Sequence, residues 1–471
     1  MLFITMVLLV VGLIHFYLWK RLVHDPLRPG PARRIGTVVA VVLFALVPLT
    51  LVGVRAGYFK WLSWPGYMWI AVMFYLLVSL AVLEIPRLVA TRLWVRSGRT
   101  ASVVKDGAAT PDRIATANGT PGATVASSGG AAETATTAGG APETMPTAGG
   151  APETVATAGG APETVATAGG DSGTKATAES GTAGTVVSDG AVPGDTKQGV
   201  ERRLLLARGA AIFAGLTAAG VTGYGVKTAT GLPQIDRFQM PMVKLPRAMD
   251  GTRLAVVSDI HIGPLTGVDH AQRIVQVINS VNADVVCVVG DLVDGSVAEL
   301  GRFAAPLGDI QSRHGAFFVT GNHEYYSGAE EWIAEVDRLG VRPLRNERVA
   351  INGLDLAGVN DISGAQQGDA ADYARALGDR DTARPVVLMA HQPVAARDAA
   401  PYGVDLQVSG HTHGGQMAPF NMLVKLQQPV VSGFGEVDGV PVYVTNGAGF
   451  WGPPVRVGAP PQVTVIELRV A

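Results

Sequence analysis

The chain has 471 residues, of which 48% are hydrophobic and 16% charged, and its formal net charge is −2. This length exceeds that of one ordinary domain. The near-neutral charge, without a basic patch interleaved with aromatic residues, gives no reason to expect a nucleic-acid partner. Cys287 is the only cysteine, which excludes an intrachain disulfide. Its place in the apolar run 285–289 is typical of a buried structural thiol.

Residues 1–100 contain three apolar stretches of membrane length, at about residues 2–19, 35–54 and 67–85. A helix needs about 20 mostly apolar residues to cross the hydrocarbon core, so we predict a three-helix transmembrane region. The first stretch could instead be a cleaved signal peptide. It has no basic residues before its apolar run and no clear small-residue cleavage site, which favours an uncleaved span.

Residues 101–200 are rich in Ala, Gly, Thr, Pro and Glu, and they contain a ten-residue unit that recurs from Thr137, Thr147 and Thr157. Such a unit lacks the apolar positions that a core needs. The repeats therefore predict a flexible, disordered linker rather than a solenoid.

Residues 201–231 predict a fourth membrane anchor. An apolar run from Gly209 to Val226 follows a cluster that contains Arg202, Arg203 and Arg208. The pattern is similar to a twin-arginine export signal placed inside the chain. We interpret the segment as an ordinary anchor with basic flanks, and the export-like pattern as a hint to how the following domain travels.

The distribution of basic residues predicts the orientation of the spans. The loop after the first span has basic residues at 20, 21, 28, 33 and 34, whereas the next loop has only Arg55 and Lys60. Arginines also follow the third span and precede the fourth. By the positive-inside bias, the first loop and the linker are cytoplasmic. We therefore expect a multi-pass protein of the cell membrane whose C-terminal domain is extracytoplasmic.

Residues 232–471 have the pattern of one globular α/β domain, in which short β-branched runs alternate with helix-like stretches. Five of these runs end in residue types that bind metals, namely Asp259 with His261, Asp291, Asn322 with His323, His391, and His411 with His413. Residues at the carboxyl ends of strands in open α/β folds can converge in one crevice. Each motif alone is weak evidence, but the five in this order indicate a metal site.

This series of motifs resembles the calcineurin-like metallophosphoesterase family, and most closely its bacterial membrane-associated or exported branch. The resemblance covers about residues 232–471. It implies a two-sheet β-sandwich flanked by helices, and two divalent metal ions whose identity (Mn, Fe or Zn) the mixed N/O ligands leave open.

The resemblance also implies a role for each matching residue. Asp259, His261 and His413 would hold one metal. The other would be held by Asn322, His391 and His411, with Asp291 bridging both. His323 would not bind metal, and would instead supply a proton or a positive charge to the leaving group. Glu324 departs from the aspartate of many relatives, but its carboxylate could still orient His323.

The chemistry expected of such a site is the hydrolysis of a phosphoester. Two ions would clamp the phosphoryl group, and a metal-bridging hydroxide would be the nucleophile. Arg456 is a candidate contact for a substrate phosphate. Asp294 either supports a metal ligand or caps a helix, and Phe450 with Trp451 either forms an apolar wall for a lipid tail or packs in the ordinary way.

We therefore predict a dinuclear metal-dependent phosphoesterase that acts at the outer face of the membrane on a phosphodiester or a lipid-linked phosphoester. Its expected partners are the phosphoester substrate and membrane lipids, with no nucleic acid, and protein partners remain open. The alternative is a non-catalytic metal-binding module of a membrane sensor or partner-binding protein. A transporter is disfavoured, because Glu84 is the one acidic residue near a span and it lies at the edge.

Overall fold

The computed structural model describes residues 2–54, 57–90 and 197–471. The linker predicted for residues 101–200 lies outside these ranges except for its last four residues. The described ranges contain a set of long apolar helices and an α/β region that spans residues 234–471.

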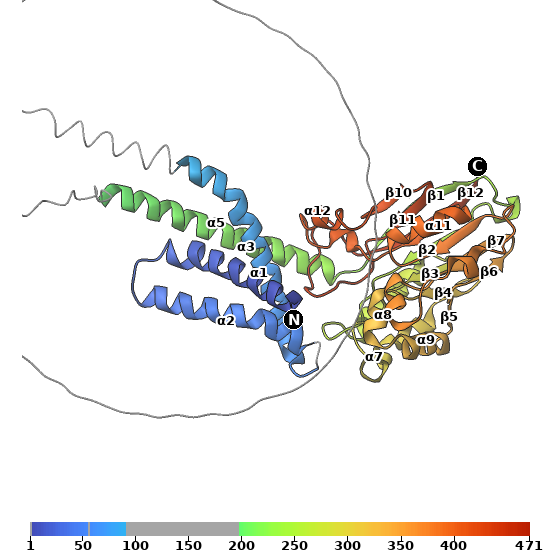
Figure 1. Cartoon of the computed structure of the whole chain (residues 1–471), viewed down its shortest axis with the longest axis horizontal. Helices are drawn as coiled ribbons and strands as arrows, with labels where there is room; N and C mark the ends of the chain where they lie inside the picture. The colour runs from blue at the N-terminus through green and yellow to red at the C-terminus, as the bar shows by residue number, and fades with distance from the viewer. Residues whose placement is uncertain (1, 55–56, 91–196) are drawn as a thin grey trace, which may run out of the picture. The chain divides into compact units, whose positions relative to one another are not determined.

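Four helices in the described part of the chain are long and apolar enough to cross a membrane. They are α1 (Leu2–Trp19), which continues into the π-helix η1 (Lys20–His24), then α2 (Pro31–Gly53), α3 (Ser63–Ala90), which the short turn η2 (Lys60–Leu62) precedes, and α5 (Lys197–Ala229). Figure 1 shows these helices beside one another. Each of the four predicted spans overlaps one of these helices, and α3 extends beyond both ends of its predicted span.

The surfaces of these helices differ from those of helices in a soluble protein. Large apolar side chains stay exposed, with Leu9 at 62%, Val52 at 67% and Leu216 at 71%. Small residues lie where the helices touch, since Ala71 on α3 and Ala214 on α5 are completely buried in one cluster. Close packing through small residues beside lipid-facing apolar surfaces is the pattern expected of membrane helices.

The α/β region contains two six-stranded sheets. The first has the order β1-β12-β2-β3-β4-β5, with bounds β1 Gln234–Met242, β2 Arg253–Val257, β3 Val285–Val289, β4 Ala316–Val319, β5 Val341–Pro343 and β12 Gln462–Val470. The second has the order β10-β11-β9-β8-β7-β6, with bounds β6 Glu347–Ile351, β7 Leu354–Gly358, β8 Val386–Met389, β9 Leu406–Ser409, β10 Gly433–Val437 and β11 Val440–Val444. Both sheets are mixed, with parallel strands at their centres.

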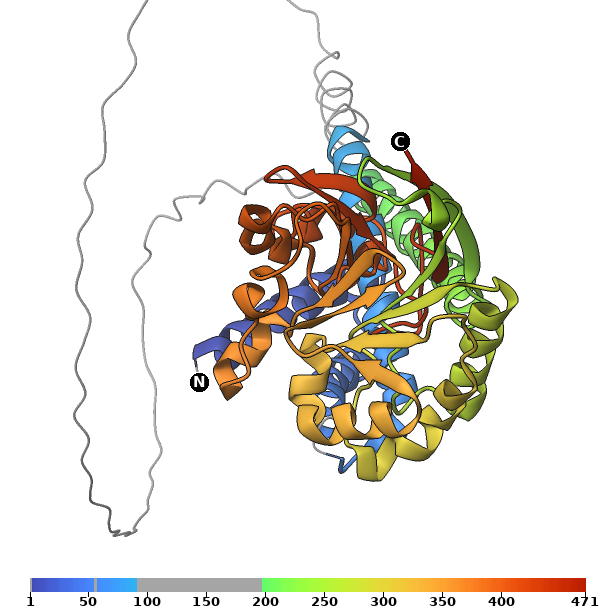
Figure 2. The same ribbon diagram turned by 90° about the vertical axis from the view of Figure 1, so that its right-hand side faces the viewer.

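Short helices connect these strands. The α-helices are α6 (Val268–Ser280), α7 (Val297–Ala304), α8 (Asn322–Ser327), α9 (Ala329–Arg338), α10 (Tyr373–Leu377), α11 (Ala396–Ala399) and α12 (Asn421–Val424). The 3-10 turns are η4 (Arg247–Met249), η5 (Ala305–Asp309), η6 (Ile362–Gln367), η7 (Pro393–Ala395), η8 (Ala400–Tyr402) and η9 (His413–Gly415). Figure 2 shows helices along the outside of the strands.

The alternation of side chains along each strand explains the layers. Leu254 and Val256 on β2 pack into the core between the two sheets, whereas Ala255 and Val257 pack against the helices outside the first sheet. A third core lies outside the second sheet, where Leu388 on β8 packs with residues of α10 and α11. Successive residues of a strand face opposite sides, so a strand that is apolar at every position suits burial on both faces. The predicted two-sheet sandwich flanked by helices is confirmed.

The parallel strands also determine where the polar loops gather. In the first sheet β2, β3 and β4 run parallel, and in the second β8, β9 and β11 do so. The carboxyl ends of parallel strands meet at one edge of a sheet. The loops that carry the predicted metal ligands all follow these ends.

Candidate metal centre

Most predicted metal ligands lie within three residues of the end of a buried strand; the exceptions are His261, four residues after β2, and His413, which begins the η9 turn. Asp259 follows β2, Asp291 follows β3 and Asn322 follows β4. His391 follows β8 and His411 follows β9. Both sheets therefore contribute donor atoms to one place.

The backbone at these positions adopts an uncommon conformation. Five of the predicted ligands have positive φ, with values of 53° at Asp259, 50° at His261, 53° at Asp291, 71° at His411 and 52° at His413. A non-glycine residue in this region costs about 1–2 kcal/mol. Such strain persists where the surrounding structure holds it, and it is concentrated at functional sites.

Two glycines allow the loops to approach this closely. A Cβ on Gly321 would collide with the backbone nitrogen and Oδ1 of Asp291, and a Cβ on Gly410 would collide with Ser258 and with Oδ2 of Asp259. Both glycines precede predicted ligands. The glycine in these motifs is therefore required for close approach of one loop to the next.

The first group of donor atoms comes from Asp259, His261 and His413, whose ligand atoms lie within 4.8 Å of one another. Nε2 of His261 is 3.0 Å from Nε2 of His413, and Oδ1 of Asp259 is 3.2 Å from the latter atom. All three residues are buried. Two imidazole nitrogens and a carboxylate oxygen directed at one point form a donor set that suits a divalent transition metal.

The second group comes from Asp291, His391 and His411, again within 4.8 Å. Nε2 of His391 is 3.2 Å from Oδ2 of Asp291 but is not aligned for a hydrogen bond. Oδ2 of Asp291 is also 3.9 Å from Nε2 of His261 in the first group. The Asp291 carboxylate therefore faces both groups, as a bridging ligand must.

Unpartnered atoms support the assignment of a metal to the second group. Oδ1 of Asn322, Nε2 of His391 and Nδ1 of His411 are buried without a hydrogen-bond partner. Buried polar atoms are normally paired. The three residues are those predicted to hold one metal, so the donor set fits a cation.

His323 lies beside both groups and is held by the carboxylate of Asp294, for which the sequence left two roles open. Oδ1 of Asp294 is 2.7 Å from Nδ1 of His323 and 2.8 Å from Nδ1 of His261. A carboxylate at Nδ1 fixes the orientation of an imidazole and leaves Nε2 directed into the site. Of the two roles left open for Asp294, the structure supports the one in which it supports a ligand.

The suggestion that Glu324 orients His323 is wrong. The buried Glu324 carboxylate instead accepts hydrogen bonds from the backbone nitrogens of Gly321, Asp291 and Leu292, at 2.6, 3.0 and 2.7 Å. Burial and the neighbouring Asp291 carboxylate raise the pKa of Glu324 to about 7. Glu324 holds together the loops after β3 and β4.

The carboxylates and imidazoles gathered at the site shift one another's pKa values. Burial disfavours the protonated form of His261, but Asp294, Asp291 and Asp259 together raise its pKa to about 9. Burial opposes ionisation of Asp291 too, yet His391, His323 and His261 hold the pKa of Asp291 well below its usual range. A bound cation would replace imidazole protons in offsetting these negative charges.

Arg456 does not fit the predicted contact with a substrate phosphate. Its side chain is completely buried, and its guanidinium donates to the backbone carbonyls of Gly449, His413, Asn446 and Ala459. Nη2 also lies 3.1 Å from Nδ1 of His413. Because these contacts occupy its five N–H groups, Arg456 positions the loop of His413.

Comparison with known proteins agrees with this geometry. Residues 252–415 match the calcineurin-like phosphoesterase family. A transmembrane protein with a metallophosphoesterase domain from Danio rerio is 37% identical over 262 residues, which cover 53% of this chain and 60% of that protein. An uncharacterized metallophosphoesterase from Helicobacter pylori is 38% identical over 239 residues, covering 50% of this chain and 64% of that protein.

The share of each relative's length that aligns with this chain differs among the relatives. An uncharacterized metallophosphoesterase from Aquifex aeolicus is 33% identical over 243 residues, which are 50% of this chain and 92% of that protein. The first two relatives are covered over less than two thirds of their length. Among solved structures, a sulfate thiohydrolase of Thermus thermophilus has a TM-score of 0.30 at 13% identity over 48% of this chain and 57% of its own, a likeness that supports no further argument. From its motifs, its fold and these relatives, the chain belongs to the calcineurin-like metallophosphoesterase family.

Proposed function

We propose that the protein is a membrane-bound hydrolase of phosphoesters that uses two divalent metal ions. The observation that carries this proposal is the arrangement of Asp291, whose Oδ2 faces His261 of one donor group and His391 of the other. A carboxylate shared by two sets of N/O donors is the feature expected of a two-metal hydrolase. Zinc, iron and manganese all suit this mixed donor set.

We assign each ligand to one or both of the two ions. Asp259, His261 and His413 would hold one ion, Asn322, His391 and His411 would hold the other, and Asp291 would contact both. When bound, the two ions would stabilise the charge on the phosphoryl oxygens and supply a strong oxygen nucleophile near neutral pH.

His323 would act on the leaving group. Its side chain is 13% exposed, and its Nδ1 is fixed by Asp294 at 2.7 Å. Nε2 is therefore free to donate a proton to the departing oxygen of the ester. General acid catalysis of this kind is typically worth about 10²–10⁴-fold in rate.

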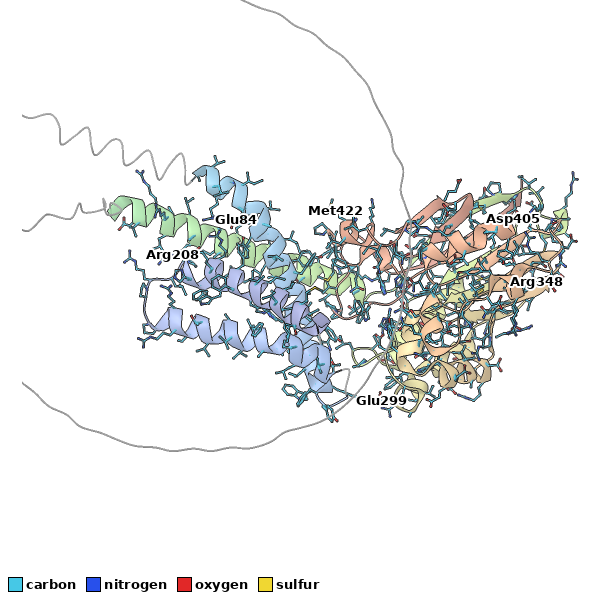
Figure 3. All side chains as sticks on the ribbon, viewed as in Figure 1. Glu84, Arg208, Glu299, Arg348, Asp405 and Met422 are labelled. Atoms are coloured by element: carbon cyan, nitrogen blue, oxygen red, sulfur yellow. The ribbon has the colours of Figure 1, made fainter. Side chains whose placement is uncertain are left out.

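Apolar residues near the site support a lipid-linked substrate at the outer leaflet. The indole of Trp451 is 58% exposed, and its ring centroid is 5.9 Å from that of His323. In and after α12, Met422 is 69% exposed and Leu426 is 83% exposed, and Figure 3 shows Met422 pointing outward from this helix. Exposed apolar residues of this kind typically mark contact with a membrane or partner.

The α12 segment and the loop of Trp451 also lie next to the membrane helices. The backbone nitrogen of Arg456 donates to the carbonyl of Gly225 on α5 at 2.9 Å. The ring of Phe420 packs edge-on to Phe74 of α3, at 6.4 Å between centroids. These contacts support a metal centre beside the bilayer surface, where it would meet the headgroup of an amphiphile. The positive-inside bias supports the extracytoplasmic face.

Turnover by the full chain in detergent tests the hydrolase directly. The protein is stripped of metal and given Mn²⁺, Zn²⁺ or Fe²⁺ in turn, and hydrolysis of a chromogenic phosphodiester and a phosphomonoester is followed. Asp291→Asn removes the shared ligand, whereas Asp379→Asn removes a carboxylate whose side chain is 83% exposed. We expect metal-dependent turnover that is lost in Asp291→Asn and kept in Asp379→Asn.

The other outcomes separate the alternatives. Turnover of a micellar lipid phosphoester well above that of the soluble esters would support the lipid-linked substrate, and equal turnover would argue against it. Metal binding without turnover of any of these esters would favour the non-catalytic metal-binding module. Failure to bind metal would rule out the proposed centre.

A further inference from the structure

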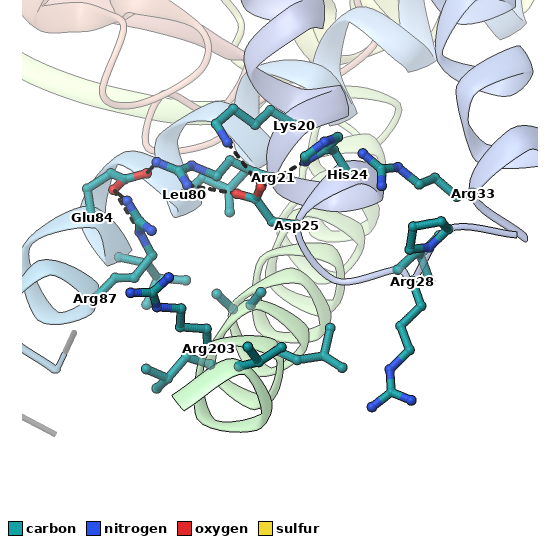
Figure 4. Close-up of a pocket in the computed structure, with 18 residues that line it drawn as sticks. Lys20, Arg21, His24, Asp25, Arg28, Arg33, Leu80, Glu84, Arg87 and Arg203 are labelled. Atoms are coloured by element: carbon teal, nitrogen blue, oxygen red, sulfur yellow. Dashed lines mark hydrogen bonds and ion pairs between the residues drawn. The ribbon is translucent and has the colours of Figure 1, made fainter. Parts of the chain in front are cut away.

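A cavity of about 700 Å³ opens between the four membrane helices, lined by parts of residues 20–33, 80–87 and 200–210. Figure 4 shows it at the ends of these helices. The helix α5 leads from this cavity to Gly225, whose carbonyl meets the α/β region. From Leu206 to Gly225 the helix rises about 28 Å, close to the hydrocarbon thickness of about 30 Å. The cavity therefore lies at the membrane boundary opposite the metal centre.

The lining of the cavity is strongly cationic. It includes six lysines and arginines but only two carboxylates, Asp25 and Glu84. Both carboxylates are already engaged. Asp25 pairs with Lys20 at 3.1 Å and with Arg21 at 2.9 Å, and Glu84 pairs with Arg21 and Arg87, each at 2.8 Å. Figure 4 shows these pairs along one side, with Arg203 of α5 below them in this view.

Two arginines of the lining have no such pairing. Within the described residues, no ion pair joins Arg28 or Arg33 to a carboxylate. Arg33 lies in the first turn of α2 and is half-buried, whereas Arg28 is exposed in the preceding loop. Positive charge at this rim is therefore in excess and available to an anion.

The remaining wall of the cavity is apolar. Leu80 and Leu83 on α3 and Leu204 on α5 contribute to it, and Leu80 is 3% exposed. A small soluble anion would gain nothing from this wall. An amphiphile with an anionic phosphate headgroup and acyl chains matches both halves of the lining, because basic pockets between membrane helices bind anionic lipid headgroups.

We propose that this cavity binds the phosphate-bearing headgroup of an anionic membrane lipid, with Arg28 and Arg33 contacting the phosphate and the leucines contacting the chains. The site is separate from the metal centre, and the proposal does not depend on phosphoester hydrolysis. By the positive-inside bias, the lipid would belong to the cytoplasmic leaflet.

Native mass spectrometry of the full chain in a neutral detergent tests this proposal. Short-chain phosphatidylglycerol, short-chain phosphatidylcholine and inorganic phosphate are titrated separately, and the bound fraction is measured. We expect phosphatidylglycerol to bind at least about fivefold more tightly than phosphatidylcholine, and Arg33→Gln to weaken its binding by about fivefold. The double variant Arg28→Gln/Arg33→Gln should weaken it by about 25-fold.

Arg34 supplies a matched control, because it neighbours Arg33, is exposed and does not line the cavity. Arg34→Gln changes the net charge equally and should bind phosphatidylglycerol as the unmodified protein does. Arg33→Lys keeps the charge, and it should retain binding even if Arg33→Gln does not fold. Equal weakening by Arg34→Gln, equal affinity for phosphatidylcholine, or inorganic phosphate binding as tightly as phosphatidylglycerol would overturn the proposal.

Discussion

Asp294 orients two histidines of the site, since one of its carboxylate oxygens contacts Nδ1 of both His261 and His323. We expect Asp294→Ala to lower turnover by about 10–100-fold and to weaken metal binding, because the carboxylate behind a ligating histidine sets its orientation and basicity. His323→Ala should lower turnover by about 10²–10⁴-fold with unchanged metal content. Metal analysis beside kinetics distinguishes the two variants.

Asp309→Ala is the control for that comparison, because Asp309 is exposed and lies outside the site. It should keep both turnover and metal content. If Asp294→Ala bound metal as tightly as the unmodified protein and hydrolysed ester at the same rate, the orienting role of Asp294 would be wrong.

His270 contacts the backbone between two predicted metal ligands, and its burial makes stability depend on pH. It is 6% exposed and its Nε2 lies 3.0 Å from the carbonyl oxygen of Ile260. Burial, together with Arg273 and His261, lowers the pKa of His270 to about 4. The unfolded chain has a His pKa of about 6.5, so the unfolded chain binds a proton first as the pH falls. Stability from this residue is therefore lost between about pH 6.5 and 4, by about 2 kcal/mol at pH 5.

Thermal unfolding of the full chain at pH 7.5 and pH 5 measures this effect. The fall in Tm on acidification should be smaller in His270→Gln than in the unmodified protein. His314→Gln, on a half-buried residue elsewhere in the fold, should show the full fall. Identical falls in all three proteins would exclude His270 as the source.

For single residues, the sequence predicted the positions of candidate ligands better than the contacts that each side chain makes. The sequence correctly predicted that Asp259, Asp291 and His391 follow buried strands, because short buried strands can be recognised from their β-branched runs. The functions of Asp294, Glu324 and Arg456 depend on which loops meet in space. Arg456 in particular lies between two prolines and a glycine, a context typical of an exposed turn, and no local signal indicates that it is buried.

Among the elements, the central strands were the most predictable. The runs at β2, β3, β4, β8, β9 and β11 were recognised because they are mostly apolar and are closely followed by Gly, Asp, Asn or His. The edge strand β1 was not, because it contains Pro241 and is mostly exposed. The pairing of β1 with β12 joins residues more than 200 positions apart, and sequence spacing contains no information about such a contact.

The loop after β4 requires glycine at position 321. A Cβ at this position would collide with Asp291. We expect Gly321→Ala to displace the Asp291 carboxylate, to lower metal binding and turnover by more than about tenfold, and to destabilise the fold by about 1–3 kcal/mol through overpacking. Gly267→Ala is the matched control, since nothing lies within 4 Å of its Cβ position. Metal retention and turnover equal in the two variants would contradict this expectation.

At the scale of the whole molecule, composition revealed the membrane-length helices directly. The four long helices were identified from apolar length alone, because a membrane-spanning helix must satisfy its backbone internally and present apolar side chains to lipid. Composition does not show how the helices pack. The salt bridge between Arg21 and Glu84, which joins η1 to α3, therefore emerged only from the structure.

The side of the membrane on which the α/β region lies can be measured by cysteine labelling, because the chain's own cysteine is buried. Cys287 is completely buried, and burial raises the pKa of its thiol to about 12, so it should resist labelling in the folded protein. A cysteine introduced as Asp379→Cys replaces an exposed residue of the α/β region, and Arg34→Cys replaces an exposed residue near the start of α2. With a membrane-impermeant maleimide on intact cells, we expect Asp379→Cys to be labelled and Arg34→Cys to be labelled only after permeabilisation. The reverse pattern would place the metal centre in the cytoplasm, and it would move the basic cavity to the outer leaflet.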